Sequence, residues 1–522
     1  MNTNNNLALP ETASLQSIFD KGCQQYSQNN AFKCGSQSIS YMELDHQSKS
    51  FAAYLQENTE LQPGDRIALQ LPNCIAYAVI AWGALRAGLV IVNVNPLYTE
   101  NELAHMYQDS GAKALIVLSS SIEMVSNLVN ESDISVLFYI NNATAELNNL
   151  TVDTIEYTDC LTQGSNCKFT PVYASPDDTA LLQYTGGTTG LAKAAVLTHA
   201  NLVSAARSFW DTTGVFEAGN EIFAAPLPLY HVYAFVGHIV VGVIYGVTSI
   251  LITNPRDIPA LHNALKDSKF SLFVGINTLF NMLCQDPLFR TLDFSGLKFT
   301  LSGGMALNQR VALRWEELTR CQINEGYGLT ESSAGVIINR GEHDRRLGSV
   351  GKPMQGVEIK VIGDKGQRLA AGEKGELFIK GKQIMKEYWH NPSATTAILQ
   401  DGWLATGDIA LIDEEGFVYI VDRIKDVIIV SGFNVYPAEI EQVVNRLSDV
   451  QECAAVGIES EDTGEAVQLF VVLKENVISE ATIIEHCRKN LAAYKIPKVI
   501  KVINELPKSP VGKVLKRMLK TH

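Results

Sequence analysis

Hydrophobic positions in the first half of the chain follow two alternating patterns. Short apolar runs at residues 66–71 and 90–94 predict buried strands, and the longer apolar run at residues 76–87 predicts a buried helix. Gly88 directly follows that longer run, and glycine is the residue that most often ends a helix. Strands and helices that alternate in this way predict parallel sheets with helices on both faces.

The same alternation continues to about residue 301. Thr99 and Glu102 have the spacing of a capping box, which predicts the start of a helix that ends at Gly111. Residues 141–168 are polar, acidic and poorly periodic, so we interpret them as a variable surface connection. Further buried strands are predicted at residues 114–118, 179–183, 248–252, 271–274 and 298–301.

The pattern changes after Leu347. Short strands with alternating polar and apolar residues, separated by glycine turns, predict an antiparallel β subdomain. A last segment begins near Val427 and predicts a small α+β domain. Its expected elements are helices at 437–447 and 482–491 and strands at 453–458, 469–473 and 499–503. The predicted fold class is α/β: a large N-terminal domain of parallel α/β subdomains with a small antiparallel β subdomain, then the small α+β domain.

Composition and charge narrow the range of partners. The 522 residues are 46% hydrophobic, which is enough for several cores. The formal net charge of −14 provides no global basic field to hold a nucleic acid. A single nucleotide site built from backbone amides and a few lysines is compatible with this acidic balance.

Cysteine usage and the N-terminal segment predict a cytoplasmic protein. The nine cysteines are scattered without a CxxC pair, which favours reduced thiols over a zinc site. The first residues have neither the basic stretch nor the apolar stretch of a secretion signal. The apolar run at 76–87 is short of the ~20 residues that a membrane-spanning helix needs.

The strongest local signal is the segment Tyr184-Thr-Gly-Gly-Thr-Thr-Gly-Leu-Ala-Lys193, which follows a predicted buried strand. Its glycines allow the backbone to curl, so that amides and threonine hydroxyls can face phosphate oxygens, and Lys193 adds a positive charge. It lacks the Gly-Lys-[Ser/Thr] ending of a Walker A loop. The structural alternative is a flexible polar turn.

A second signal is Asn324-Glu-Gly-Tyr-Gly-Leu-Thr-Glu331. Tyr327 stands between Gly326 and Gly328, which would let a planar base approach its ring. Thr330 could bond a phosphate, and Glu331 is a suitable oxygen ligand for Mg²⁺. The alternative is a tight turn with a partly buried tyrosine. The Gly303-Gly304 pair after a predicted strand suits close passage of a ligand but is weak evidence alone.

Four further positions have weaker signals. Asp408 follows a glycine turn and could accept a ribose diol, or belong to a plain turn. The mixed charges at residues 422–426 are equally typical of a salt-bridged surface linker. Lys513 lies in a loop bounded by proline and glycine, next to a basic tail that is expected to be solvated. His231, beside prolines and a tyrosine, is more often a structural histidine.

Taken together and in this order, the motifs resemble the adenylate-forming superfamily, which comprises acyl-CoA synthetases, luciferases and the adenylation domains of peptide synthetases. The resemblance covers residues 18–517. Within the superfamily the chain is most similar to bacterial long-chain fatty-acid–CoA ligases. The segments that resemble that group are residues 93–99, 275–281, 401–427 and 431–437.

The resemblance implies roles for these residues. The ATP phosphates would contact Thr185, Gly186, Gly187, Thr188, Thr189, Gly190 and Lys193. The adenine would lie among Gly303, Gly304, Glu325 and Tyr327, and Gly326 and Gly328 are further implied cofactor contacts. Thr185 and Glu331 would bind Mg²⁺, and Asp408 and Arg423 the ribose. The residues implied in catalysis are Lys513, His231 and Thr330, and Gly432 is an implied cofactor contact.

The implied reaction has two halves. A fatty acid of medium to long chain is activated by ATP to an acyl-adenylate with release of pyrophosphate, and the acyl group is then transferred to coenzyme A. Lys425 would be the hinge, also near the cofactor, between an N-terminal domain at 1–424 and a mobile C-terminal domain at 425–522. A homodimer and a peripheral contact with the inner face of the membrane stay open.

Four residues depart from the pattern of the long-chain ligases: Ala192, Ala194, Ala405 and Ile424. None of them removes a charge assigned to the chemistry, but they weaken the inference of a long-chain substrate. Within the superfamily the alternatives are transfer to an acyl carrier protein, an aryl or other carboxylic acid as substrate, and an oxidative luciferase. An alternative from another class is a non-catalytic regulator that binds a nucleotide or an acyl group.

Overall fold

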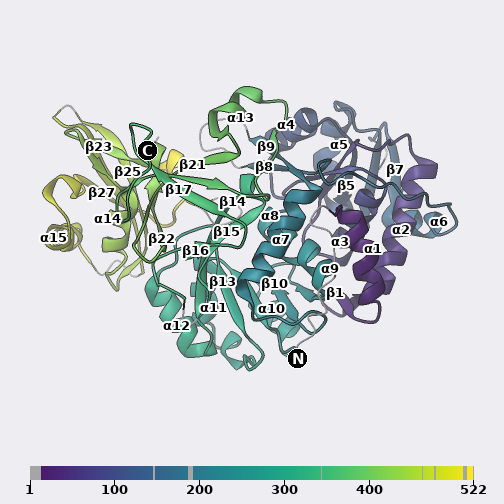
Figure 1. Ribbon diagram of the computed structural model, residues 1–522, viewed down its shortest axis with the longest axis horizontal. Helices are drawn as coiled ribbons and strands as arrows, with labels where there is room; N and C mark the ends of the chain where they lie inside the picture. The colour runs from purple at the N-terminus through teal and green to yellow at the C-terminus, as the bar shows by residue number, and fades with distance from the viewer. Residues whose placement is uncertain are drawn as a thin grey trace. The chain divides into compact units, whose positions relative to one another are not determined.

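The computed structural model describes residues 13–144, 147, 149–185, 192–341, 344–460, 462–474, 478–508 and 514–520. It divides into two compact units (Figure 1). Unit 1 consists of Met1–Val357 and Lys380–Gly402, and unit 2 of Glu358–Ile379 and Trp403–His522. Among the described helices, none is long and apolar enough to cross a membrane.

Unit 1 contains a sheet of eight strands in the order β19-β9-β8-β4-β3-β5-β6-β7. The strands from β8 to β7 run parallel, whereas β9 is antiparallel to β8 and β19 is antiparallel to β9. Their bounds are β3 Arg66–Gln70, β4 Val90–Asn93, β5 Ala112–Leu118, β6 Val136–Ile140, β7 Asp153–Glu156, β8 Thr179–Thr185, β9 Lys193–Thr198 and β19 Glu387–Tyr388.

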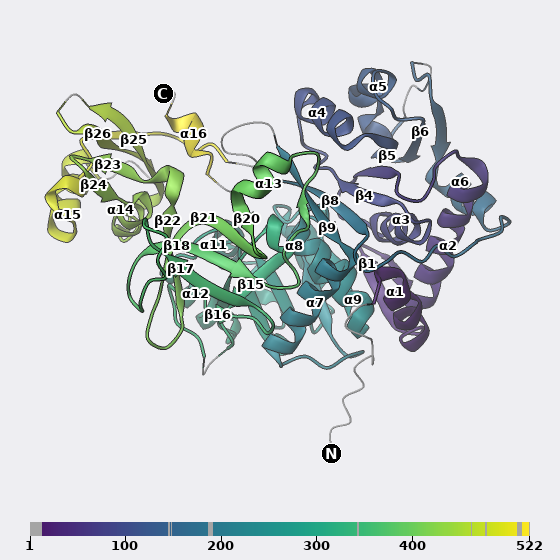
Figure 2. The same ribbon diagram turned by 45° about the horizontal axis from the view of Figure 1, so that its top comes forward.

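Helices cover both faces of this sheet, as the alternating pattern predicts (Figure 2). Side chains of one strand point alternately to opposite faces, so Ile67 and Leu69 join one hydrophobic core and Ala68 joins another. The first core includes residues of α2 (Tyr41–Asn58) and α3 (Ile75–Arg86). The second includes residues of α4 (Glu100–Ser110) and α5 (Ile122–Asn130). The predicted capping box at Thr99 and the left-handed Gly111 that ends α4 are both present.

The second sheet of unit 1 has nine strands in the order β16-β15-β14-β13-β12-β10-β11-β1-β2. It is parallel from β14 to β1 and antiparallel at β15, β16 and β2. The bounds are β1 Asn30–Cys34, β2 Gln37–Ser40, β10 Ile222–Ala225, β11 Thr248–Leu251, β12 Leu272–Gly275, β13 Phe299–Ser302, β14 Ile323–Leu329, β15 Ala334–Ile338 and β16 Lys352–Pro353.

Helices also cover both faces of the second sheet. One face packs on α10 (Ile258–Leu265), α11 (Asn277–Gln285) and α12 (Gln309–Thr319) around the buried Trp315. The other face shares the first core with the helices that pack on the eight-stranded sheet. Further helices of that shared core are α1 (Leu15–Gln25), α7 (His199–Thr213), α8 (Val232–Ala234), the π-helix η2 (Phe235–Val240) and α9 (Val241–Tyr245).

The interpretation of residues 141–168 as an irregular surface connection is wrong for their second half. Strand β7 forms the edge of the eight-stranded sheet, and α6 (Tyr157–Gly164) packs against α2. An edge strand pairs on one side only, so it can keep polar residues and gives a weak hydrophobic pattern. Helix α6 buries only Tyr157, Cys160 and Gly164. At Gly164 a Cβ would lie 2.0 Å from the Ser50 carbonyl oxygen, so this contact requires glycine.

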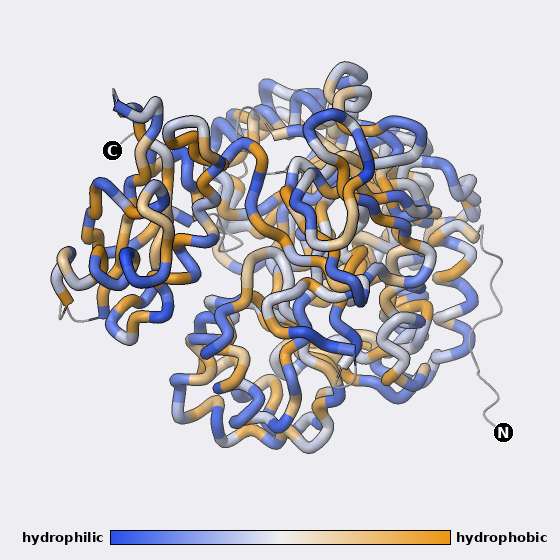
Figure 3. The backbone as a smooth tube through the Cα atoms, turned by 60° about the vertical axis from the view of Figure 1, so that its left-hand side comes forward, coloured by the Kyte–Doolittle hydropathy of each residue, from blue (hydrophilic) through white to orange (hydrophobic). Residues whose placement is uncertain are grey.

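Unit 2 contains the two smaller sheets that the change of pattern predicts. The first is antiparallel and includes β17 (Glu358–Ile362), β18 (Gly375–Lys380), β21 (Trp403–Ile412) and β22 (Val418–Arg423). The second includes β23 (Ile428–Val430), β24 (Phe433–Val435), β25 (Val450–Ser460), β26 (Gly464–Leu473) and β27 (Val499–Val502). Helices α14 (Pro437–Val444) and α15 (Glu480–Asn490) share its core, and α16 (Lys516–Leu519) packs near β25. Figure 3 shows hydrophobic and hydrophilic residues interspersed along the chain.

Candidate active site

The two ends of the Thr/Gly loop are held side by side in unit 1. Thr185 ends β8 and Lys193 begins β9, and the two residues are cross-strand partners in the antiparallel ladder. The Thr185 hydroxyl donates to the Lys193 carbonyl oxygen at 3.3 Å. Both ends of the predicted phosphate loop are therefore fixed by a buried strand. The loop residues between them, Gly186, Gly187, Thr188, Thr189 and Gly190, lie outside the described residues.

Glu331 lies on a short turn that packs against the same hairpin. Strand β14 is followed by the 3₁₀ turn η4 (Thr330–Ser332), and η4 contacts both β8 and β9. The Met385 amide donates to the Glu331 carbonyl oxygen at 2.8 Å. The structure therefore brings together Thr185, Lys193 and Glu331, as the sequence analysis expects of a phosphate and Mg²⁺ site. A carboxylate and a hydroxyl are hard oxygen ligands, and Mg²⁺ often takes one or two such groups beside substrate phosphates.

Tyr388 belongs to this cluster and is absent from the sequence prediction. Strand β19 pairs with β9 so that Tyr388 lies opposite Ala195. The Tyr388 hydroxyl donates to Glu331 Oε1 at 2.5 Å, and the Lys193 ammonium lies 5.3 Å from the centre of the Tyr388 ring. Burial raises the pKa of Tyr388, and the Glu331 charge raises it further, so the phenol keeps the proton that it donates.

The hairpin that carries Thr330 and Glu331 is unusually tight. A Cβ at Gly328 would lie 1.8 Å from the Ala334 carbonyl oxygen, so only glycine fits there. Ser333 and Ala334 follow the turn with positive φ angles of 53° and 102°. Such conformations cost roughly 1–3 kcal/mol each and persist where the surrounding structure over-determines them. Gly328 thus has a structural role in closing the hairpin, besides any contact with a ligand.

The residues expected around adenine lie at the carboxyl ends of two adjacent parallel strands. Ser302 at the end of β13 is in register with Glu325 in β14, so Gly303 and Gly304 adjoin the residues that begin the second motif. Gly304 has a φ of +79°, and no atom lies within 4 Å of where its Cβ would be. Gly326 and Tyr327 continue β14 opposite Ile338 and Ile337 of β15. The carboxyl edge of a parallel sheet is the usual ligand edge of such folds.

Glu325 is almost fully buried, with 8% of its surface exposed. Burial raises its pKa to about 7, although the Gly348 amide, which donates to Oε2 at 3.0 Å, partly opposes the shift. Its side chain therefore changes protonation close to neutral pH, which is uncommon for a carboxyl group.

His231 caps a short helix near the end of β13. Its Nδ1 accepts a hydrogen bond from the Tyr233 amide at 3.3 Å at the start of α8. The Tyr233 ring packs against Gly303, because a Cβ there would lie 3.2 Å from a ring carbon. The apolar π-helix η2 follows directly, and π-helical turns are frequent at functional sites. The expected proximity of His231 to an acyl carboxylate stays a prediction.

Unit 2 contains the remaining predicted residues. Asp408 in β21 and Arg423 in β22 are cross-strand partners, and Arg423 Nε lies 3.1 Å from Asp408 Oδ1. Lys425 lies on the 3₁₀ turn η5 (Ile424–Asp426) and is exposed. Gly432, with a φ of +81°, forms the two-residue turn between β23 and β24 together with Ser431. Lys513 lies outside the described residues.

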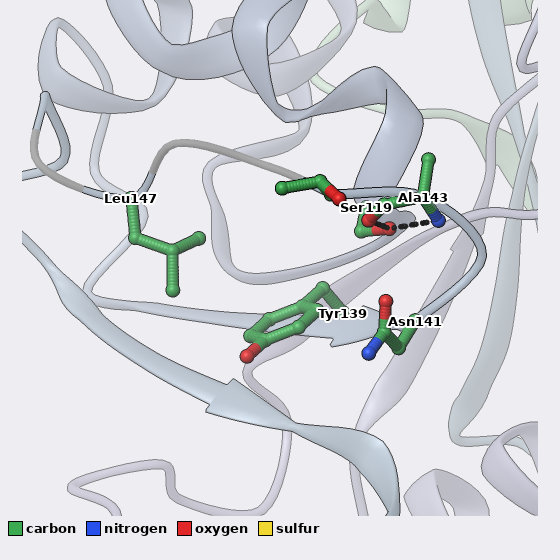
Figure 4. A pocket seen from close by; sticks show the side chains of 6 residues that line it. Ser119, Tyr139, Asn141, Ala143 and Leu147 are labelled. Atoms are coloured by element: carbon green, nitrogen blue, oxygen red, sulfur yellow. Dashed lines mark hydrogen bonds between the residues drawn. The ribbon is translucent and has the colours of Figure 1, made fainter.

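A pocket of about 290 Å³ lies in unit 1 at the carboxyl ends of β5 and β6 (Figure 4). Its lining includes Ser119, Tyr139, Asn141 and Leu147. The Ser119 hydroxyl donates to the Ala143 carbonyl oxygen at 2.7 Å and accepts from the Ala143 amide at 3.0 Å. No residue of this lining belongs to the predicted site.

Two models of known protein families match this chain. The model for AMP-binding enzymes matches residues 19–389, and the model for the AMP-binding enzyme C-terminal domain matches residues 439–513. The second match ends at Lys513, the residue expected to be the catalytic lysine.

Individual proteins are similar over nearly the whole chain. A long-chain-fatty-acid–CoA ligase of Salmonella typhimurium is 42% identical, covering 97% of this chain and 94% of the relative. The structure of ATP-bound MatB from Rhodopseudomonas palustris is 28% identical with a TM-score of 0.85, covering 97% of this chain and 98% of that chain. The o-succinylbenzoate coenzyme A synthetase of Bacillus subtilis, in complex with ATP and magnesium ion, is 27% identical with a TM-score of 0.84, covering 96% and 99%.

Proposed function

We propose, from the premise that this chain belongs to the AMP-binding enzyme family, that it activates a fatty acid with ATP and transfers the acyl group to coenzyme A. The observation that carries the proposal is the 42% identity to a long-chain-fatty-acid–CoA ligase across 97% of the chain. A fatty acid and ATP give acyl-AMP and pyrophosphate, and acyl-AMP and coenzyme A then give acyl-CoA and AMP. Chains of medium to long length are the proposed substrates.

The residues of unit 1 supply the phosphate and metal part of the site. Lys193 and the loop amides would contact the ATP phosphates, and Thr185 and Glu331 would hold Mg²⁺. The support is that Thr185, Lys193 and Glu331 meet at one hairpin base. Glu325, Tyr327, Gly303 and Gly304 at the adjacent strand ends are proposed to frame the adenine. Thr330 and His231 are proposed to lie closer to the reacting groups.

Repulsion between the negative charges of the fatty acid and of ATP is the main contribution to the barrier of the first half-reaction. A fatty-acid carboxylate that attacks the α-phosphate of ATP approaches a group of the same sign. Mg²⁺ supplies positive charge at the phosphate oxygens when bound. Lys193 and the proposed catalytic Lys513 would add charge from the protein, and positive groups fixed in a dry site stabilise a transition state more than they would in water.

We propose that unit 2 holds the ribose and includes the C-terminal domain that moves between the two half-reactions. The Asp408 carboxylate, paired with Arg423, would accept the ribose hydroxyls. We propose a domain boundary at residues 424 and 425, with Lys425 as the hinge of a C-terminal domain that carries Gly432 and Lys513. Rotation of that domain would bring different surfaces to the acyl-adenylate in the two half-reactions.

We propose a cytoplasmic enzyme that forms homodimers and contacts the inner face of the membrane only peripherally, as expected of a protein that handles fatty acids. Sedimentation equilibrium tests the dimer, and flotation with lipid vesicles tests the membrane contact.

A screen of pyrophosphate release tests the function. The enzyme is incubated with ATP, Mg²⁺ and single acids from C2 to C18 as well as aromatic acids, with and without coenzyme A. The expected result is release of pyrophosphate that depends on a fatty acid, with acyl-CoA formed only when coenzyme A is present. Acyl transfer to a carrier protein but not to coenzyme A would contradict the proposed acceptor, and no acid-dependent release at all would contradict the function.

A further inference from the structure

We infer that Tyr388 is a positioning residue for the Glu331 carboxylate, and through it for the divalent cation that accompanies ATP. This inference rests on the proposed function, because it assigns Glu331 to the metal. Tyr388 lies 57 positions from Glu331 in the sequence and belongs to none of the sequence motifs described above.

The position of Tyr388 is fixed by its neighbours on both sides. The Lys386 amide donates to the Val196 carbonyl oxygen at 3.0 Å, and the Trp389 amide donates to the Ala194 carbonyl oxygen at 2.8 Å. The Trp389 indole also donates to the Asp109 carbonyl oxygen at 3.1 Å. The two amide bonds hold β19 against β9, and the indole bond attaches Trp389 to α4, so the phenol of Tyr388 reaches Glu331 from a strand anchored on both sides.

The contact with Glu331 has the length of a strong hydrogen bond. A hydroxyl that donates to an ionised carboxylate gives distances of about 2.5–2.7 Å, and such bonds are roughly twice as strong as neutral ones. The bond engages Oε1 and restrains the orientation of the carboxylate, which would leave Oε2 available to a cation.

The ring of Tyr388 has a second contact that the hydroxyl does not provide. The Lys193 ammonium lies 5.3 Å from the ring centre, within the range of a cation–π interaction. Phenylalanine would keep this contact and the strand pairing of β19, and would remove only the bond to Glu331. Tyr388→Phe therefore isolates the positioning role from the packing role.

Metal affinity is the direct test. Binding of Mn²⁺ to the enzyme with a non-hydrolysable ATP analogue is measured by electron paramagnetic resonance. Groups that orient a metal ligand typically change metal affinity by about 10–100-fold when mutated. We expect Tyr388→Phe to weaken Mn²⁺ binding by about tenfold or more, and to raise the Mg²⁺ concentration needed for half-maximal ATP–pyrophosphate exchange by a similar factor. At saturating Mg²⁺ the exchange rate should recover to within a few-fold of the wild type.

A double-mutant cycle separates action through Glu331 from a general effect on the fold. In a Glu331→Gln background, adding Tyr388→Phe should weaken Mn²⁺ binding no further, because the group that Tyr388 orients is already gone. Tyr419→Phe is the matched control. It also removes a phenol–carboxylate contact, from Tyr419 to Asp413 Oδ2 at 3.4 Å in unit 2, and should leave Mn²⁺ binding unchanged.

Two results would overturn the inference. One is an unchanged Mn²⁺ affinity in Tyr388→Phe, and the other is an equal loss of affinity with and without Glu331→Gln. Thermal unfolding of each variant shows whether an altered fold causes the loss, and a loss accompanied by unfolding at the assay temperature counts against the inference. The Mn²⁺ titration needs no acid and no turnover. Failure of the positioning role is thus distinguishable from failure of the proposed function, which the pyrophosphate screen of the wild type decides.

Discussion

The Lys516 ammonium lies 2.8 Å from Glu441 Oε1, which joins the C-terminal helix α16 to α14. The two side chains are 19% and 20% exposed. Burial lowers the pKa of Lys516, but the carboxylates of Glu441, Asp422 and Asp426 outweigh it, and its pKa is raised above the usual value. Glu441 also accepts the Ala455 amide at 2.9 Å, so this ion pair connects three parts of unit 2.

Removing the charge of Lys516 should destabilise unit 2. In Lys516→Met the carboxylate of Glu441 keeps the Ala455 amide but loses its cationic partner, which costs about 1–3 kcal/mol for a largely buried group. Denaturant unfolding followed by circular dichroism measures the change. Lys489→Met is the control, because Lys489 pairs with Glu485 at 2.8 Å while both side chains are more than 60% exposed. Exposed pairs contribute about 0–1 kcal/mol, so an equal loss in both variants would contradict the expectation.

Lys513 lies three positions before Lys516 in the sequence, and its substitution tests the two half-reactions. Lys513→Ala should reduce acid-dependent pyrophosphate release by roughly 10²–10³, the usual effect of losing one charge contact in a transition state. Thioester formation from supplied acyl-adenylate and coenzyme A should be largely spared, because that step uses a different surface of the C-terminal domain. Lys520→Ala, in the same basic tail, should change neither rate. Equal loss of both half-reactions would count against a moving domain.

Glu325 should make stability depend on pH in the opposite sense to an ordinary carboxylate. Its pKa is raised from 4.5 to about 7 in the folded protein, so the folded state binds the proton more tightly than the unfolded state. Below pH 4.5 the Glu325 carboxyl is protonated in both the folded and the unfolded state, so its burial costs no ionisation energy. The free energy of unfolding then falls as pH rises from about 4.5 to about 7. The full loss above pH 7 is about 3.5 kcal/mol, from a shift of about 2.5 pKa units at about 1.4 kcal/mol per unit.

Glu325→Gln removes this titration and keeps an oxygen that can accept the Gly348 amide. Urea unfolding of the wild type and of Glu325→Gln at pH 5 and pH 8 should show the variant gaining relative stability at pH 8. The exposed Glu485→Gln is the control, because the pKa of Glu485 is lowered and it stays ionised across this interval. A stability difference between wild type and Glu325→Gln that is the same at both pH values would contradict the raised pKa.

Most of the fold could be predicted because the buried strands have strong local patterns. Strands β3, β4 and β5 each contain at least three consecutive apolar residues, and each lies within two residues of its predicted bounds. Strand β7 and helix α6 escaped prediction because an edge strand keeps polar residues and a two-turn helix buries few side chains. Helix α6 packs against α2, which lies about 100 positions earlier in the chain, and β7 pairs with β6.

The site could be predicted only where its residues are neighbours in sequence. The loop ends Thr185 and Lys193, and the pair Thr330 and Glu331, each belong to one short motif. Tyr388 has no such signal, since its role comes from the pairing of β19 with β9. Gly328 was expected to admit a ligand, whereas the structure gives it a backbone contact with Ala334 that sequence spacing cannot reveal.

Gly328 and Gly335 face each other across the β14–β15 ladder and provide a matched pair of substitutions. At Gly328 a Cβ would lie 1.8 Å from the backbone oxygen of Ala334, which cannot move without opening the hairpin. At Gly335 the nearest atom is the terminal methyl of Met354 at 3.0 Å, which can rotate away. Gly328→Ala should therefore disrupt the turn that carries Glu331, and Gly335→Ala should be tolerated.

The two alanine variants are compared by thermal unfolding and by Mg²⁺-dependent ATP–pyrophosphate exchange. Gly328→Ala should lose several kcal/mol of stability, as forced overpacking and backbone strain do, or should lose exchange activity by at least about tenfold while it remains folded. Gly335→Ala should stay within about 1 kcal/mol and a few-fold of the wild type. If both variants behave alike, the close approach of Gly328 to Ala334 does not determine where Glu331 lies, and the glycine would have to be explained by contact with the nucleotide instead.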